Sequence, residues 1–181
     1  MSMIDPAIGA LVSGLFVLLF ATAAVQKLRA PEQFAEVFAA YRLLPSALNR
    51  LSVLLPVLEA AVAAALLLPA SRVAAAGTGA ALLLAYAAAI AVNLRRGRLA
   101  LACGCGGPNE RRPIAPWMVL RNVLLAAALL VVALPWLPRP WSGADAVTVV
   151  GGIAVGALLY TSLDRLLARV APEGARLTGA A

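Results

Sequence analysis

Five long apolar segments constrain the fold of this chain more than any other feature of its sequence. The first has no charged residue over 6–26, and a helix of about 20 residues crosses a hydrocarbon core of roughly 30 Å. Of the 181 residues, 63% are hydrophobic and 13% are charged, against roughly 45–50% and about 25% in soluble domains. The sequence predicts an all-α, polytopic membrane helical bundle with about five transmembrane helices, over residues 6–26, 51–71, 73–94, 114–137 and 146–163.

The apolar segments take up most of the chain, so its length allows one domain. We predict an integral membrane domain over residues 1–170 and a disordered tail over residues 171–181. The first segment is expected to stay in the protein as a helix, because it lacks the basic n-region of a signal peptide. Gly152 and Gly156 have a spacing that lets two membrane helices approach closely, and we interpret them as packing residues.

A shorter helix is expected between the first two apolar segments, over residues 31–45. It begins with a proline and has a glutamate in its first turn, both of which favour a helix start. Phe34, Phe38 and Tyr41 recur at helical spacing and share one face. The sequence therefore predicts a short interfacial helix that lies along the lipid headgroups and ends at Pro45.

Basic residues are distributed unevenly among the loops, and positively charged loops prefer the cytoplasm. The second and fourth loops have only Arg72 and Arg139. We therefore predict a multi-pass inner-membrane protein with its N-terminus outside and its C-terminus in the cytoplasm. The net charge of +7 is expected to serve this topology and contact with the lipid bilayer, and not nucleic acid. The remaining loops and the tail hold Lys27, Arg29, Arg42, Arg50, Arg95, Arg96, Arg98, Arg111, Arg112, Arg165, Arg169 and Arg176.

The only two cysteines of the chain, Cys103 and Cys105, lie in a basic, glycine-rich loop over residues 93–108. Cysteines one residue apart can form a small-ring disulfide, which is strained and easily reduced. Nearby arginines favour the thiolate, the form that attacks disulfides or binds metal. A redox pair, a thiolate metal site completed by a second subunit, and two inert thiols all remain open. No metal site is expected from one chain alone, because it supplies only two thiolate ligands and has no histidine.

Two charged residues interrupt the apolar segments and are expected to face each other inside the bundle. Glu59 and Arg121 each lie nine residues from a basic residue at the predicted cytoplasmic face, which places them at equal depth. We predict that they pair, with Asn122 and Asn93 satisfying the remaining hydrogen bonds and Lys27 as the alternative partner of the carboxylate. The pair could be structural, or it could relay protons beside the cysteine loop.

A set of residues spread over most of the chain carries a family resemblance. It consists of Phe20, Lys27, Pro31, Phe34, Tyr41-Arg42-Leu43-Leu44-Pro45, Leu55-Pro56, Glu59, Asn93-Leu94, Arg96-Gly97-Arg98, Cys103-Gly104-Cys105 and Arg121-Asn122. Taken together, these residues resemble the methylamine-utilisation MauE family within the DoxX-like membrane proteins, and the resemblance covers roughly residues 8–135. It implies an inner-membrane helical bundle needed to mature methylamine dehydrogenase, an exported client rich in disulfides, together with a thioredoxin-like partner.

Three functions are compatible with these observations. The first is a thiol-disulfide redox protein, or an accessory factor for maturation of exported disulfide-containing proteins, which acts through Cys103 and Cys105. The second is a small transporter or a quinone-interacting subunit that uses Glu59, and quinone is the only cofactor left open. The third is a structural assembly factor. The predicted topology places the cysteines in the cytoplasm, where thiols are kept reduced, whereas the implied client is exported.

Overall fold

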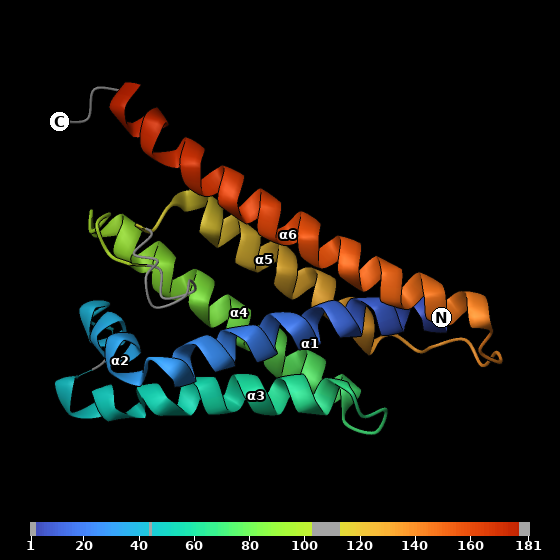
Figure 1. Ribbon diagram of the computed structural model, residues 1–181. Helices are drawn as coiled ribbons and strands as arrows, with labels where there is room; N and C mark the ends of the chain where they lie inside the picture. Colours follow the sequence, from blue (N-terminus) through green and yellow to red (C-terminus); the bar gives the residue numbers. More distant parts are fainter. Residues whose placement is uncertain (1–2, 44, 103–112, 178–181) are drawn as a thin grey trace.

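The computed structural model describes residues 3–43, 45–102 and 113–177 of the chain. The described residues form helices joined by short connections, with isolated β-bridges in place of a sheet. The longer helices run alternately along one bundle, and the two termini lie at its opposite ends (Figure 1). The predicted all-α bundle is confirmed. In chain order the elements are α1 (Pro6–Arg29), α2 (Pro31–Ala40), η1 (Ser46–Val53), α3 (Leu54–Leu66), α4 (Arg72–Arg95), α5 (Pro116–Leu130), η2 (Val131–Ala133) and α6 (Gly143–Leu177).

Four stretches of helix are long and apolar enough to cross a membrane, and the second predicted segment is the exception. Its apolar helix covers Leu51–Leu66 and so ends before the expected boundary at residue 71. Pro69 explains this end, because a proline disfavours helical backbone at the residue before it. The 3-10 helix η1 precedes α3, and the two together extend roughly 35 Å at the usual rise per residue. The fold is that of a multi-pass membrane protein.

The short helix expected after the first segment is confirmed as α2, although it ends earlier than predicted. It stops at Ala40, and Arg42 then adopts a left-handed backbone with φ 48°. This turn ends the helix before Pro45 can do so. No residue of α2 is buried, and the rings of Phe34 and Phe38 lie 6.4 Å apart on one face. The helix lies beside one end of the bundle (Figure 1).

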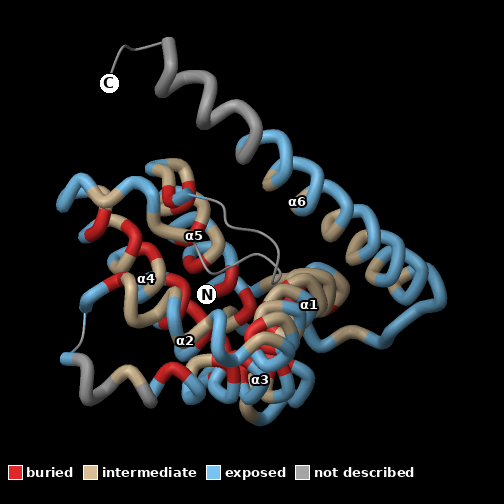
Figure 2. The backbone as a smooth tube through the Cα atoms, turned by 60° about the vertical axis from the view of Figure 1, so that its left-hand side comes forward, coloured by how far each residue is buried: buried red, intermediate tan, exposed pale blue. Residues whose placement is uncertain are grey.

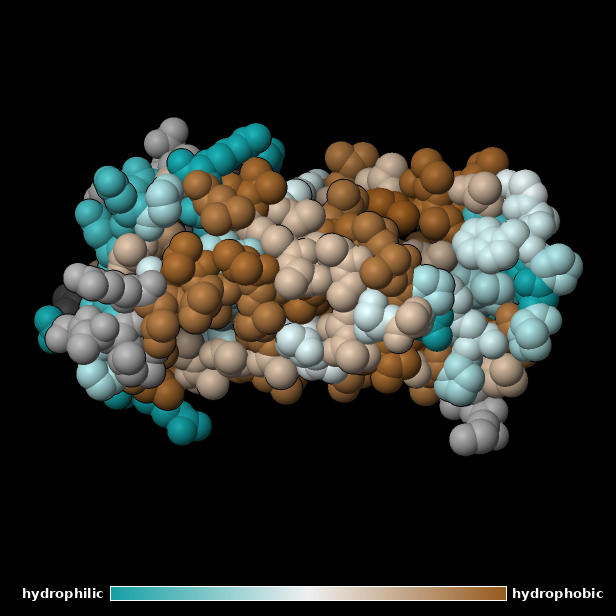
Figure 3. Space-filling model, turned by 90° about the horizontal axis from the view of Figure 1, so that it is seen from below, coloured by the Kyte–Doolittle hydropathy of each residue, from teal (hydrophilic) through white to brown (hydrophobic). Residues whose placement is uncertain are grey.

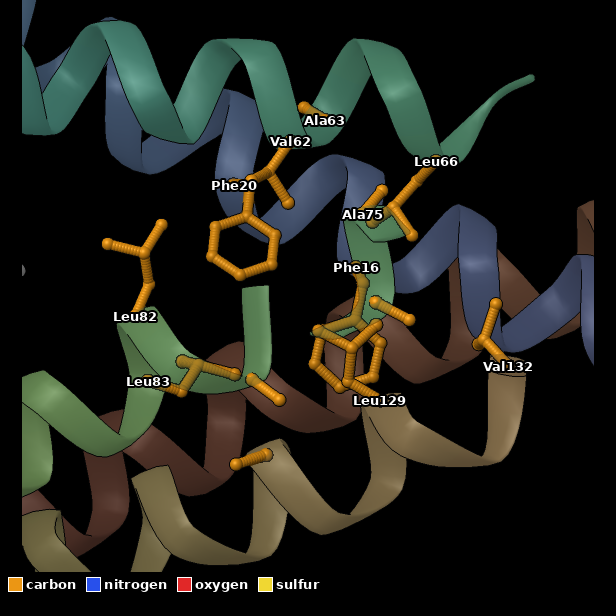
Figure 4. Packing of buried hydrophobic residues seen from close by; sticks show 13 residues of the cluster. Phe16, Phe20, Val62, Ala63, Leu66, Ala75, Leu82, Leu83, Leu129 and Val132 are labelled. Carbon is orange, nitrogen blue, oxygen red and sulfur yellow. The ribbon is translucent and has the colours of Figure 1, made fainter. Parts of the chain in front are cut away.

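The core lies where α1, α3, α4 and α5 meet. Phe16 and Phe20 of α1 point into it against Leu66, Leu83 and Leu129 from the other three helices (Figure 4). Buried alanines on α4 bring the helices close together, as is usual in membrane bundles. On the face drawn in Figure 3, the surface is hydrophobic over the middle of the bundle and hydrophilic towards both ends. This distribution suits a protein surrounded by lipid.

Helix α6 packs on α1 through small residues. The side chains of Leu11 and Leu15 lie against Gly152 and Gly156, and Ile153 lies against Gly14. The interpretation of these glycines as packing residues is confirmed. Most of α6 is exposed outside the four-helix core (Figure 2). Its backbone is helical as far as Leu177, whereas residues 178–181 lie outside the described part, and the predicted domain boundary at residue 170 stays a prediction.

The end of the bundle that holds the N-terminus is joined by charges and backbone hydrogen bonds. Arg139 donates to Asp5 and to Asp145, each at 2.7 Å, and Ile4 N–H donates to Pro135 at 2.9 Å. The Arg139 hydrogen bond lowers the pKa of Asp5, and both carboxylates raise the pKa of Arg139. The opposite end holds the arginine-rich end of α4, so the two ends differ in charge as the loop pattern predicts. The side of the membrane each faces stays a prediction.

Candidate functional site

The two cysteines of the candidate redox site, Cys103 and Cys105, lie outside the described residues. The residues that flank their loop are described. Ala102 and Pro113 form an antiparallel bridge, and Ile114 N–H donates to the Leu101 carbonyl at 2.9 Å. Both ends of the loop therefore meet at one point, at the arginine-rich end of the bundle.

Buried apolar side chains hold the base of this loop in place. Ile114 is buried together with Tyr41, Ile90 and Met118, which come from the end of α2, from α4 and from α5. This small cluster is separate from the main core. It fixes the start of α5 against the last turns of α4, so the two flanks of the cysteine loop have a defined position.

The backbone at the end of α4 explains why a glycine precedes Arg98 in the basic motif Arg96-Gly97-Arg98. Gly97 has a left-handed backbone with φ 70°. The N–H groups of Gly97 and Arg98 donate to the carbonyls of Leu94 and Asn93, both at 3.0 Å, which forms a Schellman cap. Glycine is the residue that adopts this conformation without strain. The cap turns the chain so that Arg98 follows immediately on the side of α2.

Arg98 joins the ends of α2 and α4. Its guanidinium donates to the Ala40 carbonyl at 2.7 Å, to the Tyr41 carbonyl at 3.3 Å and to Asn93 Oδ1 at 3.0 Å. These carbonyls are the ones left without intrahelical partners at a helix C-terminus, where a positive charge is also favourable. Asn93 was expected to serve Glu59, and the structure corrects this, because Asn93 binds Arg98 and the Ala89 carbonyl instead.

A second group of polar side chains lies inside the bundle, around Glu59. Lys27 Nζ is 2.5 Å from Glu59 Oε1, and the Tyr86 hydroxyl donates to the same oxygen at 2.8 Å. The Lys27 ammonium also lies 5.3 Å from the centre of the Tyr86 ring and 5.4 Å from that of Phe34. Lys27 and Glu59 are 8% and 1% exposed, so this is a buried ion pair between α1 and α3.

The predicted pairing of Glu59 with Arg121 is wrong. The carboxylate pairs with Lys27, the alternative partner, while Arg121 Nη1 lies 2.5 Å from Asp164 Oδ1 and so connects α5 to α6. The physical reason is that each charge has a nearer partner of opposite sign. Asn122 was also expected to bond to this pair, but its amide donates to the Met118 carbonyl of its own helix at 3.0 Å.

A cavity of about 260 Å³ brings these charged residues together. It is lined by α1, α3, α4, α5 and α6, and it includes both the Lys27–Glu59 pair and the Arg121–Asp164 pair. Leu83 and Leu125 contribute to its apolar walls. Within the described part of the chain, no group of three or more acidic, cysteine or histidine side chains is placed to hold a metal ion. The cavity can therefore offer hydrogen bonds and paired charges to a ligand.

The sequence of the chain is similar to one known protein family and to several curated proteins. The sequence model of the family described as "Methylamine utilisation protein MauE" matches residues 5–135. A methylamine utilization protein MauE from Paracoccus denitrificans is 38% identical over 152 residues, which are 82% of this chain and 81% of that protein. The MauE proteins of Methylophilus methylotrophus and Paracoccus versutus are 39% and 42% identical, over 90% and 82% of this chain and 87% and 81% of their own lengths.

No solved structure matches this chain significantly. The matched region includes Lys27, Glu59 and Arg121, and it also includes the whole cysteine loop. Asp164, the partner of Arg121, lies beyond it. The similarity to the relatives extends over most of each protein and not over one apolar segment alone. The chain belongs to the MauE family of membrane proteins.

Proposed function

We propose that this protein is an inner-membrane accessory factor in methylamine utilisation, and that Cys103 and Cys105 carry out thiol-disulfide exchange for an exported, disulfide-containing client. Its membership of the MauE family supports the pathway, because the relatives are named for methylamine utilisation. The observation that carries the redox role is the bridge between Ala102 and Pro113. It joins the described residues on either side of the cysteine loop, so the loop begins and ends at one fixed base.

The charge around the loop base supports the same chemistry. Arg98 is half-buried at the end of α4, five residues before Cys103, and its positive charge favours a thiolate nearby. In the proposed exchange, a client thiolate attacks the Cys103–Cys105 disulfide and forms a mixed disulfide. The second client thiol then displaces the protein sulfur, so the client is oxidised by two electrons and the cysteine pair is reduced. A thioredoxin-like partner in its disulfide form then reoxidises the cysteine pair by the reverse exchange and is itself reduced by two electrons.

Single substitutions of the cysteines test this proposal. In a methylamine-using host that lacks its own MauE protein, the wild-type chain should restore growth on methylamine, and Cys103→Ser and Cys105→Ser should each abolish it. Ala100→Ser is the matched control, because it adds a hydroxyl to an exposed position before the same loop. Either single variant growing like the wild type would overturn the redox role. If both cysteines are dispensable, the remaining function is that of a structural assembly factor.

The side from which the sulfurs are reached needs its own measurement. The proposed topology has the N-terminus outside and the C-terminus in the cytoplasm, which places the loop base at the cytoplasmic end. Labelling intact cells with a membrane-impermeant maleimide, with and without prior reduction, reports both sidedness and oxidation state. Labelling only after reduction would place an oxidised pair on the outer side. Labelling only after the cells are opened would place the pair in the cytoplasm.

A further inference from the structure

One carboxylate oxygen of Glu59, at the floor of the cavity, is buried without a hydrogen-bond partner among the described residues. Glu59 is 1% exposed, and among the described residues its Oε2 has no hydrogen-bond partner, although Oε1 binds Lys27 and Tyr86. A buried polar atom without a partner is costly, so such atoms are usually satisfied by water or by a bound molecule. Glu59 lines the cavity, so a molecule within it that carries a hydroxyl group could donate to this oxygen.

The rim of the cavity lies on the outer surface of the bundle. Thr22 of α1 and Thr161 and Arg165 of α6 line it and are exposed. Among the described residues α6 packs mainly on α1 and has little contact with α5, and it stands apart from α4 and α5 in Figure 2. The Arg121–Asp164 pair is a contact that joins α5 to α6 across this side. As far as the described residues show, the cavity opens on the side of the bundle, which lipid would surround.

The charges inside the cavity favour a neutral ligand. Lys27 is paired with Glu59 and Arg121 with Asp164, so these four charges inside the cavity are neutralised by their partners. The remaining lining charge, Arg165, is exposed at the rim. An anionic headgroup would have to approach two carboxylates, and a metal cation would have to displace an ammonium or a guanidinium. A neutral molecule with oxygen atoms can accept and donate hydrogen bonds here without separating either pair.

The size and walls of the cavity favour a single flat ring. Its volume of about 260 Å³ lies just below the range of roughly 300–1,000 Å³ that holds drug-sized ligands. Phe20, Leu83 and Leu125 form apolar walls, with Lys27 and Asn122 as donors beside Glu59 as acceptor. An apolar pocket with few polar groups, open to lipid, suits a ring that carries oxygens on two sides and a hydrocarbon tail.

We propose that this cavity binds the ring of a membrane quinone. In the oxidised form, a ring carbonyl accepts a hydrogen bond from Lys27 or Asn122. In the reduced form, a ring hydroxyl donates to Glu59 Oε2. The hydrocarbon tail leaves past the rim at Thr161, between α5 and α6. The described residues that form this site come from α1, α3, α4, α5 and α6. The proposal goes beyond the thiol-disulfide function and is tested without the cysteines.

The test is a titration of the full-length protein with decylubiquinone in phosphatidylcholine nanodiscs, followed by quenching of tryptophan fluorescence. Leu125→Phe fills the cavity wall and should weaken binding by about tenfold or more. Leu124→Phe is the matched control on the neighbouring, exposed position of α5, and it should bind like the wild type. A second pair avoids the core: Thr161→Phe narrows the rim and should weaken binding, whereas Thr148→Phe, exposed elsewhere on α6, should not.

All titrations use protein that also carries Cys103→Ser and Cys105→Ser. Binding that persists there, and is lost with Leu125→Phe, supports the quinone site even if the thiol proposal fails. Three results would overturn it: quenching no greater than in empty nanodiscs, equal weakening by each variant and its control, or displacement of the quinone by phosphatidylglycerol. The last result would assign the cavity to a lipid phosphate.

Discussion

Lys27 Nζ lies 2.5 Å from Glu59 Oε1, which joins the last turn of α1 to the first half of α3 inside the bundle. Both side chains are buried, and Tyr86 of α4 donates to the same carboxylate oxygen. One carboxylate thus connects three helices that are far apart in the sequence. The pair also forms the floor of the cavity, so its integrity determines both the packing of these helices and the polarity of the site.

The first prediction concerns the separate removal of these two charges. Lys27→Met leaves a buried carboxylate without its cation, and Glu59→Gln leaves a buried ammonium without its anion. Breaking a buried pair in this way commonly costs about 3–5 kcal/mol of the free energy of unfolding. Each single variant should therefore give less folded protein in the membrane and a lower melting temperature in detergent. The double variant Lys27→Met/Glu59→Gln should recover most of both.

The control for this cycle uses the arginine that does not pair with Glu59. Arg121→Gln removes the partner of Asp164, so its effect should add to that of Glu59→Gln without any recovery. If the Glu59→Gln/Arg121→Gln variant instead recovered stability, the result would support the Glu59–Arg121 pairing expected from the sequence. A Lys27/Glu59 double variant no better than the worse single one would show that the two charges do not depend on each other.

The error in the predicted pairing shows what depth alone can and cannot determine. The sequence places Glu59 and Arg121 at similar depth, and the structure does bring both to one cavity. However, the direction in which each side chain points depends on how the helices are rotated, which apolar segments of almost uniform composition do not specify. Asp164 lies one position beyond the fifth predicted segment, because a charged residue next to an apolar run is typical of the flank of a span.

The positions of the helices could be predicted better than their ends. Segment lengths follow from the thickness of the bilayer, so the apolar runs locate α1, α4, α5 and α6 within the chain. The ends depend on local backbone conformation. Arg42 ends the turn after α2 in a left-handed conformation, which an arginine does not predict. Gly97 adopts the same conformation at the end of α4, where glycine is common and predicts it. The role of Arg98 as a bridge to α2 requires the tertiary structure.

The second prediction concerns Arg98 and the position of α2. Its hydrogen bonds to the Ala40 and Tyr41 carbonyls are lost in Arg98→Gln, and hydrogen bonds to a charged group contribute about 1.5–3 kcal/mol. Hydrogen exchange of the last turn of α2 should accelerate in this variant, while α1 and α3 stay protected. Arg95→Gln, at an exposed position one turn earlier, is the control and should leave exchange unchanged. Equal acceleration in both variants would contradict the bridging role.

The third prediction is a dependence on pH at the end of the bundle that holds the N-terminus. The hydrogen bond from Arg139 lowers the pKa of Asp5 below its ordinary value of about 4. A carboxyl group with a lowered pKa stabilises the folded state above its unfolded pKa, and this contribution is lost as the pH falls through the folded value. Wild-type protein should therefore melt at a lower temperature when the pH is reduced from 7 to 3.

The variant Asp5→Asn isolates this charge. Asn accepts the Ala7 N–H hydrogen bond at the start of α1 as Asp does, but it carries no charge for Arg139. Other carboxyl groups also titrate in this range, so the measured quantity is the difference between the two proteins. The variant should be less stable than the wild type at pH 7, and the difference should shrink on acidification. A difference that stays constant from pH 7 to pH 3 would show that Asp5 acts only as a helix cap.

The fourth prediction concerns the packing of α6 on α1. Leu15 lies so close to Gly156 that an added Cβ would come within 2.9 Å of its Cδ2, and Gly152 has a similar contact with Leu11. A leucine at either glycine would force the helices apart, and overpacking of this kind typically costs about 1–3 kcal/mol. Gly152→Leu and Gly156→Leu should therefore both lower the melting temperature of the purified protein.

Gly151 provides the matched control for these variants. It neighbours Gly152 on α6, but it is exposed, and no atom would lie within 4 Å of an added Cβ. Gly151→Leu changes helix propensity as the other substitutions do, by up to about 1 kcal/mol in favour of the helix, without touching α1. Its melting temperature should equal or exceed that of the wild type. If all three variants shift the melting temperature alike, the effect comes from the backbone of α6, and close contact with α1 does not hold that helix in place.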